Sequence, residues 1–158
     1  LPKNAAITMD AGTLCLQATD ALNYWHPKSL FTPLDFGLVG FSYACGLGVK
    51  LAMPDRPVIS LMGDGGFGMT VSEISTAVDH GINTVTVVMN NKCWGAEKAY
   101  QRDFFNGRYI GADVSARRLT SSPNFMARGA FALTHWTRWL ARSRPPWRAA
   151  SQLWSMLR

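Results

Sequence analysis

Two short polar motifs carry the groups of this chain that are best suited to bind a metal ion. Asp64 lies in the sequence Gly63-Asp64-Gly65, and Asn91 is the second residue of the pair Asn90-Asn91. A carboxylate oxygen beside an amide oxygen suits Mg²⁺, which few protein oxygens usually hold while phosphate and water complete its octahedron. The glycines around Asp64 would leave backbone N–H groups free to approach a phosphate at the start of a helix. The two motifs therefore predict a metal-bridged diphosphate site.

The elements around the two motifs would bring them together in space. Val58–Met62 is an apolar run that predicts a buried strand, and Thr84–Met89 is a β-branched run that predicts a second one. Val71–Asp79, between them, has the pattern of a helix. A strand–helix–strand unit with short connections forms a parallel crossover, so both strands end at the same edge of the sheet. We therefore expect Asp64 and Asn91 side by side at the carboxyl edge, where open α/β sheets bind ligands.

Two other interpretations of the glycine motif are weaker. Gly63, Gly65 and Gly68 also fit the G-x-G-x-x-G fingerprint of dinucleotide-binding proteins, which needs an acidic residue after the second strand to bind the ribose. That strand ends here in two asparagines, and an aspartate inside the loop would repel a pyrophosphate unless a cation lay between them. A plain strand–turn–helix with Asp64 as N-cap would leave the asparagine pair unexplained. Metal–diphosphate binding accounts for both motifs.

The two motifs and the interval between them resemble the signature of thiamine-diphosphate-dependent enzymes. In that family the aspartate, the second asparagine and a main-chain carbonyl two residues later hold Mg²⁺. The resemblance therefore implies Asp64, Asn91 and Cys93 as metal ligands. It also implies thiamine diphosphate and Mg²⁺ as the cofactors.

Two upstream segments extend the resemblance. Asp10–Thr13 stands where the family has a loop that contacts phosphate. Phe36–Gly40 stands where a glycine-flanked aliphatic side chain wedges the cofactor into its bent form, and Val39 would be that wedge. The resemblance implies the following cofactor-binding residues: Gly12, Thr13, Gly37, Val39, Gly63, Asp64, Gly65, Gly66 and Asn91.

The segment after the asparagine pair separates relatives within the family. Cys93–Val114, and above all Trp94–Lys98, resembles the sulfoacetaldehyde acetyltransferases most closely. This resemblance implies a transferase that converts sulfoacetaldehyde and phosphate to acetyl phosphate and sulfite. The alternative is an acetolactate synthase-like carboligase or decarboxylase, so the implied substrate is a small 2-oxo acid or sulfoacetaldehyde. The roles of Trp94, Glu97 and Lys98 stay open.

The resemblance also implies a partner. In intact members of the family, homodimers or homotetramers, the cofactor lies between this domain and a second domain of a neighbouring subunit. That second domain carries the glutamate that activates the cofactor, so no catalytic residue is assigned here and the chain alone is expected to be inactive. The chain opens on Leu1 rather than an initiator methionine, and we expect it to be truncated at both ends.

The remaining patterns predict an α/β fold, a parallel sheet flanked by helices, as in thiamine-diphosphate-binding domains. Ala5–Thr8 predicts a first strand, and Thr13–Asn23 predicts a helix beside the phosphate loop. Val39–Met53 predicts an apolar helix whose small residues permit close packing, and Ala96–Tyr100 begins another helix. We expect residues 1–114 to form the cofactor-binding domain, in part.

Residues 115–158 differ in composition from the rest of the chain. Residues 1–114 hold all ten acidic residues and eight of the sixteen basic ones, for a net charge of −2; residues 115–158 hold the other eight, all arginine, for +8. We expect residues 115–158 to be translated out of frame or disordered. The sheet would then lack its final strand. We also expect the chain to bind neither nucleic acid nor a membrane. The alternative is a non-catalytic adaptor that binds nucleic acid or membranes through a basic amphipathic helix. The apolar residues of that helix would be Phe131, Leu133, Trp136, Trp139 and Leu140.

Cysteine usage and hydropathy indicate the compartment. Cys15, Cys45 and Cys93 are few, odd in number and without metal-ligand spacing, which fits a reducing cytoplasm. No apolar run approaches the roughly 18 residues that a transmembrane helix needs, and no signal peptide leads the sequence. We therefore expect a cytoplasmic protein.

Overall fold

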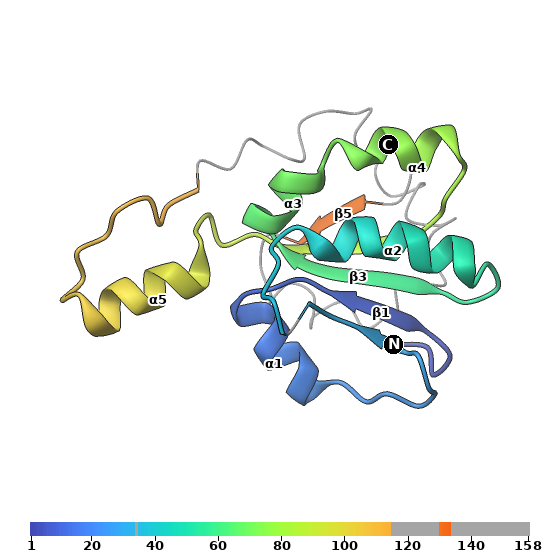
Figure 1. The fold of residues 1–158 in the computed structure, drawn as a ribbon, viewed down its shortest axis with the longest axis horizontal. Helices are drawn as coiled ribbons and strands as arrows, with labels where there is room; N and C mark the ends of the chain where they lie inside the picture. Colours follow the sequence, from blue (N-terminus) through green and yellow to red (C-terminus); the bar gives the residue numbers. More distant parts are fainter. Residues whose placement is uncertain (34, 115–129, 134–158) are drawn as a thin grey trace.

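The computed structural model describes residues 1–33 and 35–114, together with a strand at 130–133. Its elements are β1 (Ala6–Met9), α1 (Thr13–Ala21), β2 (Leu30–Phe31), α2 (Phe41–Ala52), β3 (Val58–Gly63), α3 (Asp64–Thr70), α4 (Glu73–Asp79), β4 (Val85–Met89), α5 (Gly95–Phe104) and β5 (Ala130–Leu133). The strands form one parallel sheet in the order β2-β1-β3-β4-β5. The predicted class, an α/β fold with a parallel sheet flanked by helices, is confirmed (Figure 1).

Two apolar layers hold the helices on the sheet, because side chains along each strand alternate between its faces. On one face, Leu47 of α2 belongs to a buried cluster with Met62 of β3 and Phe67 of α3. On the other face, Met9 of β1 belongs to a buried cluster with Cys15 of α1. The strands are therefore fixed in register, and so are the loops that leave their carboxyl ends.

The crossover between β3 and β4 becomes helical earlier than predicted. The sequence predicts a helix over Val71–Asp79, but α3 begins at Asp64, directly after β3, and α4 begins at Glu73 after a short break. Glycines disfavour helices, but those of α3 let other parts of the chain approach closely, as described below. The other predicted elements agree with the observed ones to within two residues at their ends, except that α5 runs four residues beyond Tyr100; the two-residue β2 was not predicted.

The sheet has a strand after β4, so the expectation that it lacks one is wrong. β5 pairs in parallel with β4, and Phe131 is the register partner of Val87. Phe131 and Leu133, assigned above to an amphipathic helix, therefore lie in a strand, because short apolar runs fit either period. The rest of residues 115–158 lies outside the described part of the chain. The domain division after residue 114 stays a prediction.

The structure shows the state of the three cysteines and whether any described helix could span a membrane. Cys15, Cys45 and Cys93 are free thiols, the first buried and the others half-buried. Within the residues that the structure describes, no helix is long and apolar enough to cross a membrane.

Arg56 ties together the amino-terminal end of the sheet. Its guanidinium donates to the carbonyls of Asn4 (2.8 Å) and Ala5 (3.2 Å), just before β1. It also donates to the Lys28 carbonyl (3.1 Å) and the Ser29 hydroxyl (2.9 Å), just before β2. Replacing Arg56 with methionine removes these four bonds and a longer one to Met53 Sδ (3.5 Å), and we expect the free energy of unfolding in urea to fall by about 2 kcal/mol.

The matched control for this prediction is Arg102→Met. Arg102 pairs with its neighbour Asp103 on exposed α5, where an ion pair contributes little. Its loss should change the free energy of unfolding by less than about 0.5 kcal/mol. Equal effects of the two substitutions would show that Arg56 does not hold the strands together.

Candidate functional site

The two polar motifs lie at one edge of the sheet, as the sequence predicts. Asp64 follows the last residue of β3, and the asparagine pair follows the last residue of β4. β3 and β4 are parallel neighbours, and their final residues, Gly63 and Met89, are register partners. The loops that leave these two strands therefore start next to each other.

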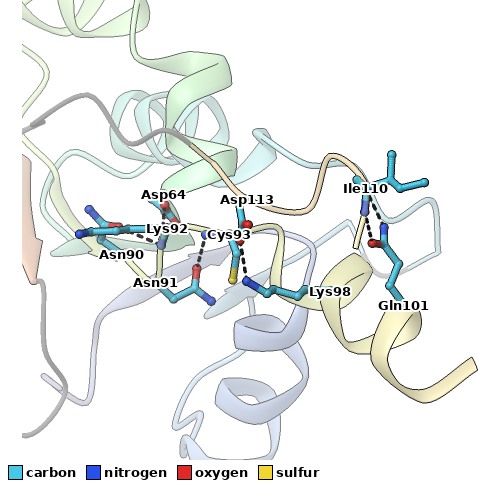
Figure 2. Close-up of polar contacts among 9 residues, drawn as sticks. All are labelled: Asp64, Asn90, Asn91, Lys92, Cys93, Lys98, Gln101, Ile110 and Asp113. Atoms are coloured by element: carbon cyan, nitrogen blue, oxygen red, sulfur yellow. Dashed lines mark hydrogen bonds and ion pairs between the residues drawn. The ribbon is translucent and has the colours of Figure 1, made fainter. Parts of the chain in front are cut away.

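The carboxylate of Asp64 is buried and only half satisfied. The residue is 4% exposed. Oδ2 accepts a hydrogen bond from the backbone N–H of Lys92 (3.1 Å), which joins the two loops (Figure 2). Oδ1 is buried and has no hydrogen-bond partner among the described residues. A buried polar atom without a partner costs free energy, and a bound cation would offset that cost.

The loop after β4 is shaped by its own asparagines. Asn90 Oδ1 accepts from the N–H of Lys92 (3.2 Å), and Asn91 Oδ1 accepts from the N–H of Cys93 (3.2 Å) (Figure 2). Such side-chain-to-backbone bonds two residues on stabilise tight turns, and Lys92 has the positive φ of such a turn (59°). Sequence reasoning gave Asn90 and Lys92 no role, although an asparagine pair after a strand is a known turn signal.

The predicted phosphate-contacting loop lies beside Asn91. A Cβ on Gly95 would lie 2.8 Å from Thr13 Oγ1 and 3.3 Å from Asn91 Nδ2, so these two residues flank the start of α5. Gly12 (φ +104°) and Gly37 (φ +66°) adopt conformations that favour glycine and have open space beside them. With Thr13 they line a cavity of about 510 Å³ whose opposite wall is α5.

Asp10 joins the Val39 loop to α3, a role that sequence reasoning missed. It is buried, and its carboxylate accepts the backbone N–H groups of Gly40 (3.0 Å) and Ser42 (3.2 Å) at the start of α2. Burial raises its pKa, and the backbone donors oppose that rise. A Cβ on Gly66 would lie 1.9 Å from Asp10 Oδ2 and 3.4 Å from Val39 Cγ1. Val39 therefore lies next to α3, although it is distant from α3 in sequence.

Trp94 packs on the first turn of α3. A Cβ on Gly65 would lie 2.5 Å from the indole ring, so only glycine allows this approach. Gly63, by contrast, has open space where its Cβ would be. The glycines flanking Asp64 thus differ: one admits an aromatic side chain and the other faces free space.

The donor set of this edge fits a hard cation. The described residues contain no group of three His, Cys, Asp or Glu side chains that could hold a metal. The oxygens available are one carboxylate, one amide and main-chain carbonyls, which are ligands that Mg²⁺ accepts when phosphate and water complete its shell. Burial raises the pKa of the Cys93 thiol above its ordinary value. The residues present therefore fit Mg²⁺ better than a thiophilic metal.

A family model and two curated proteins show what this chain is similar to. The family described as "Thiamine pyrophosphate enzyme, C-terminal TPP binding domain" matches residues 10–132. A sulfoacetaldehyde acetyltransferase of Alcaligenes xylosoxydans xylosoxydans is 35% identical over 135 residues, which are 85% of this chain and 22% of that protein. An acetolactate synthase large subunit of Parasynechococcus marenigrum is 29% identical over 127 residues, 80% of this chain and 20% of that one. The chain thus spans about a fifth of the length of the curated relatives it matches.

A solved structure shares the fold. The thiamine diphosphate-dependent 4-hydroxybenzoylformate decarboxylase of Rhodococcus jostii RHA1 superposes with a TM-score of 0.74 at 25% identity, over 89% of this chain and 26% of that one. The family match begins at Asp10, at the end of β1, and runs into β5. It includes every residue that the sequence assigns to the cofactor. This chain belongs to the thiamine pyrophosphate enzymes and carries their C-terminal TPP-binding domain.

Proposed function

We propose that this domain binds the diphosphate of thiamine diphosphate through a Mg²⁺ ion held by Asp64, Asn91 and the main-chain carbonyl of Cys93. The observation that carries the proposal is the buried Oδ1 of Asp64, which has no partner among the described residues. A divalent cation there would offset part of the negative charge of the carboxylate and of a diphosphate. Asn91 and Cys93 belong to the loop that Asp64 already contacts through Lys92.

The remaining predicted residues have roles consistent with this site. Thr13, next to Asn91, would contact the diphosphate with its hydroxyl, and Gly12 would let the backbone approach it. Val39 would support the thiazolium ring from the side of α3, with Gly37 leaving room beside it. Once bound, thiamine diphosphate supplies a stabilised carbanion. The chain itself supplies binding, orientation and charge.

For the complete protein we propose the reaction of a sulfoacetaldehyde acetyltransferase, in a homodimer or homotetramer. Two relatives with that name are 35% and 36% identical to this chain. The alternative is an acetolactate synthase-like reaction, since relatives of that name match at 29% to 33% identity.

Cofactor binding is tested by calorimetric titration of the chain with thiamine diphosphate. We expect binding in Mg²⁺ and none in excess EDTA, since the diphosphate would then face Asp64 without a cation. At a ligand concentration of about 100 times Kd, bound cofactor should raise the free energy of unfolding by about 2.7 kcal/mol. Thiamine, which lacks the diphosphate, is the control. Equal binding with and without metal would rule out the proposed site.

The reaction is tested with a chimera in which residues 10–114 replace the matching segment of the Alcaligenes enzyme. We expect it to release sulfite from sulfoacetaldehyde in the presence of phosphate. The 158-residue chain on its own should release none, because activation of the cofactor is proposed to need a glutamate of another domain. Acetolactate formation from pyruvate by the chimera, without sulfite release, would favour the alternative.

A further inference from the structure

The chain after α5 returns to the loop that follows β4. Asn106 (φ 51°) and Gly111 (φ 62°) have positive φ values where the chain reverses, and the return segment, residues 111–114, then runs beside residues 92–94. The Trp94 N–H donates to the carbonyl of Ala112 (2.8 Å). The Val114 N–H donates to the carbonyl of Lys92 (2.9 Å). These two bonds lie on either side of an antiparallel bridge between Cys93 and Asp113.

This register leaves the backbone of Cys93 facing away from the return segment. In antiparallel pairing, residues flanked by the hydrogen bonds form a non-hydrogen-bonded pair, and their own N–H and C=O groups point outward. The Cys93 N–H accordingly donates to Asn91 Oδ1 (3.2 Å), on the other side. Its carbonyl points outward with it. The pairing of Lys92 and Trp94 with the return segment therefore keeps the Cys93 carbonyl on the opposite side.

The return segment is fastened to α5 by polar contacts. Lys98 Nζ lies 2.5 Å from Asp113 Oδ1 (Figure 2). It also lies 5.4 Å from the centre of the Tyr109 ring. Gln101 donates to the carbonyl of Ile110 (3.0 Å) and accepts its N–H (2.7 Å). α5 has no buried residue, and it projects away from the sheet (Figure 1). The contacts between α5 and the return segment described here are therefore mainly polar.

We propose that Lys98 and Asp113 are positioning residues for the Mg²⁺ site, because their ion pair holds the return segment against Lys92 and Trp94, and this pairing keeps the Cys93 carbonyl on the side of Asn91. The inference rests on the proposed function. It gives a role to Lys98, which the sequence left open. It also separates two ion pairs of α5: Lys98–Asp113 bridges to the return segment, whereas Arg102–Asp103 joins adjacent residues.

The test compares Lys98→Met with Arg102→Met in titrations of thiamine diphosphate, once with Mg²⁺ and once with Ca²⁺. Mg²⁺ demands near-ideal octahedral geometry, whereas Ca²⁺ tolerates irregular shells. Loss of this exposed ion pair should therefore weaken Mg²⁺-dependent binding by about threefold, and Ca²⁺-dependent binding much less. The urea midpoint of the metal-free chain should stay the same in both variants. The double variant Lys98→Asp, Asp113→Lys should regain most of the Mg²⁺-dependent affinity.

The outcomes separate this inference from the proposed function. Absence of metal-dependent binding by the unaltered chain would overturn the proposed function and this inference with it. Normal binding by the unaltered chain, with equal Mg²⁺ and Ca²⁺ effects in Lys98→Met or with the same loss in Arg102→Met, would overturn the inference alone.

Discussion

Asp64→Asn is expected to weaken Mg²⁺-dependent binding of thiamine diphosphate at least 100-fold while leaving the metal-free chain as stable as the original, or more so. The substitution keeps the size of the side chain and an oxygen that can accept the Lys92 N–H. It removes the negative charge of a buried carboxylate whose Oδ1 has no partner among the described residues. A charge that is costly without metal and needed with it is the mark of a binding residue rather than a structural one.

Calorimetry with and without Mg²⁺ measures the first effect, and urea unfolding in EDTA measures the second. The control is Asp55→Asn, which makes the same change at an exposed residue ahead of β3, at the opposite end of that strand. It should alter neither quantity. Cofactor affinity that survives in Asp64→Asn, or a metal-free chain that loses its fold, would contradict the role given to Asp64.

Gly66→Ala is expected to lower the free energy of unfolding by about 3 kcal/mol, through overpacking and the loss of hydrogen bonds to a buried carboxylate. The added methyl group would lie 1.9 Å from Asp10 Oδ2 and 3.4 Å from Val39 Cγ1. Asp10 is buried, and its carboxylate accepts hydrogen bonds from the N–H groups of Gly40 and Ser42. The carboxylate therefore cannot move away from the added methyl group without breaking these bonds. The start of α2 and the Val39 loop would have to move with it.

Gly68→Ala is the matched control on the same helix. The Cβ of an alanine there would meet open space, so the substitution should stabilise the chain by roughly 0.4–1 kcal/mol by restricting the unfolded state. Urea unfolding of both variants checks the pair. Similar effects at the two positions would show that α3 does not pack on Asp10 as described.

The sequence predicts the sheet well where strands carry a strong pattern. β3 and β4 are apolar and β-branched runs joined by a short crossover, so their shared edge follows from topology alone. The positions of Asp64 and Asn91 at that edge are therefore predictable without any contact being known. β2 is too short to show a hydrophobic pattern. β5 is a single apolar run inside a segment of unusual composition, so the sequence did not identify it as a strand.

Contacts between distant loops could not be predicted. The Asp10 carboxylate meets Gly40 and Ser42 only after β1 and α2 have packed, and a lone aspartate after a strand does not reveal its partners. The close approach of Trp94 to Gly65 depends in the same way on where two loops leave the sheet. Family resemblance supplied the cofactor, whereas physical patterns in the residues supplied only a metal and a diphosphate.

The most direct measurement of the central claim is the anomalous scattering of Mn²⁺, substituted for Mg²⁺, in crystals of the chain grown with thiamine diphosphate. The account predicts one peak about 2.0–2.2 Å from Asp64 Oδ1, Asn91 Oδ1 and the carbonyl oxygen of Cys93, with diphosphate oxygens completing the shell. A diphosphate bound at this edge without a metal peak, or a peak that none of these three oxygens reaches, would contradict it.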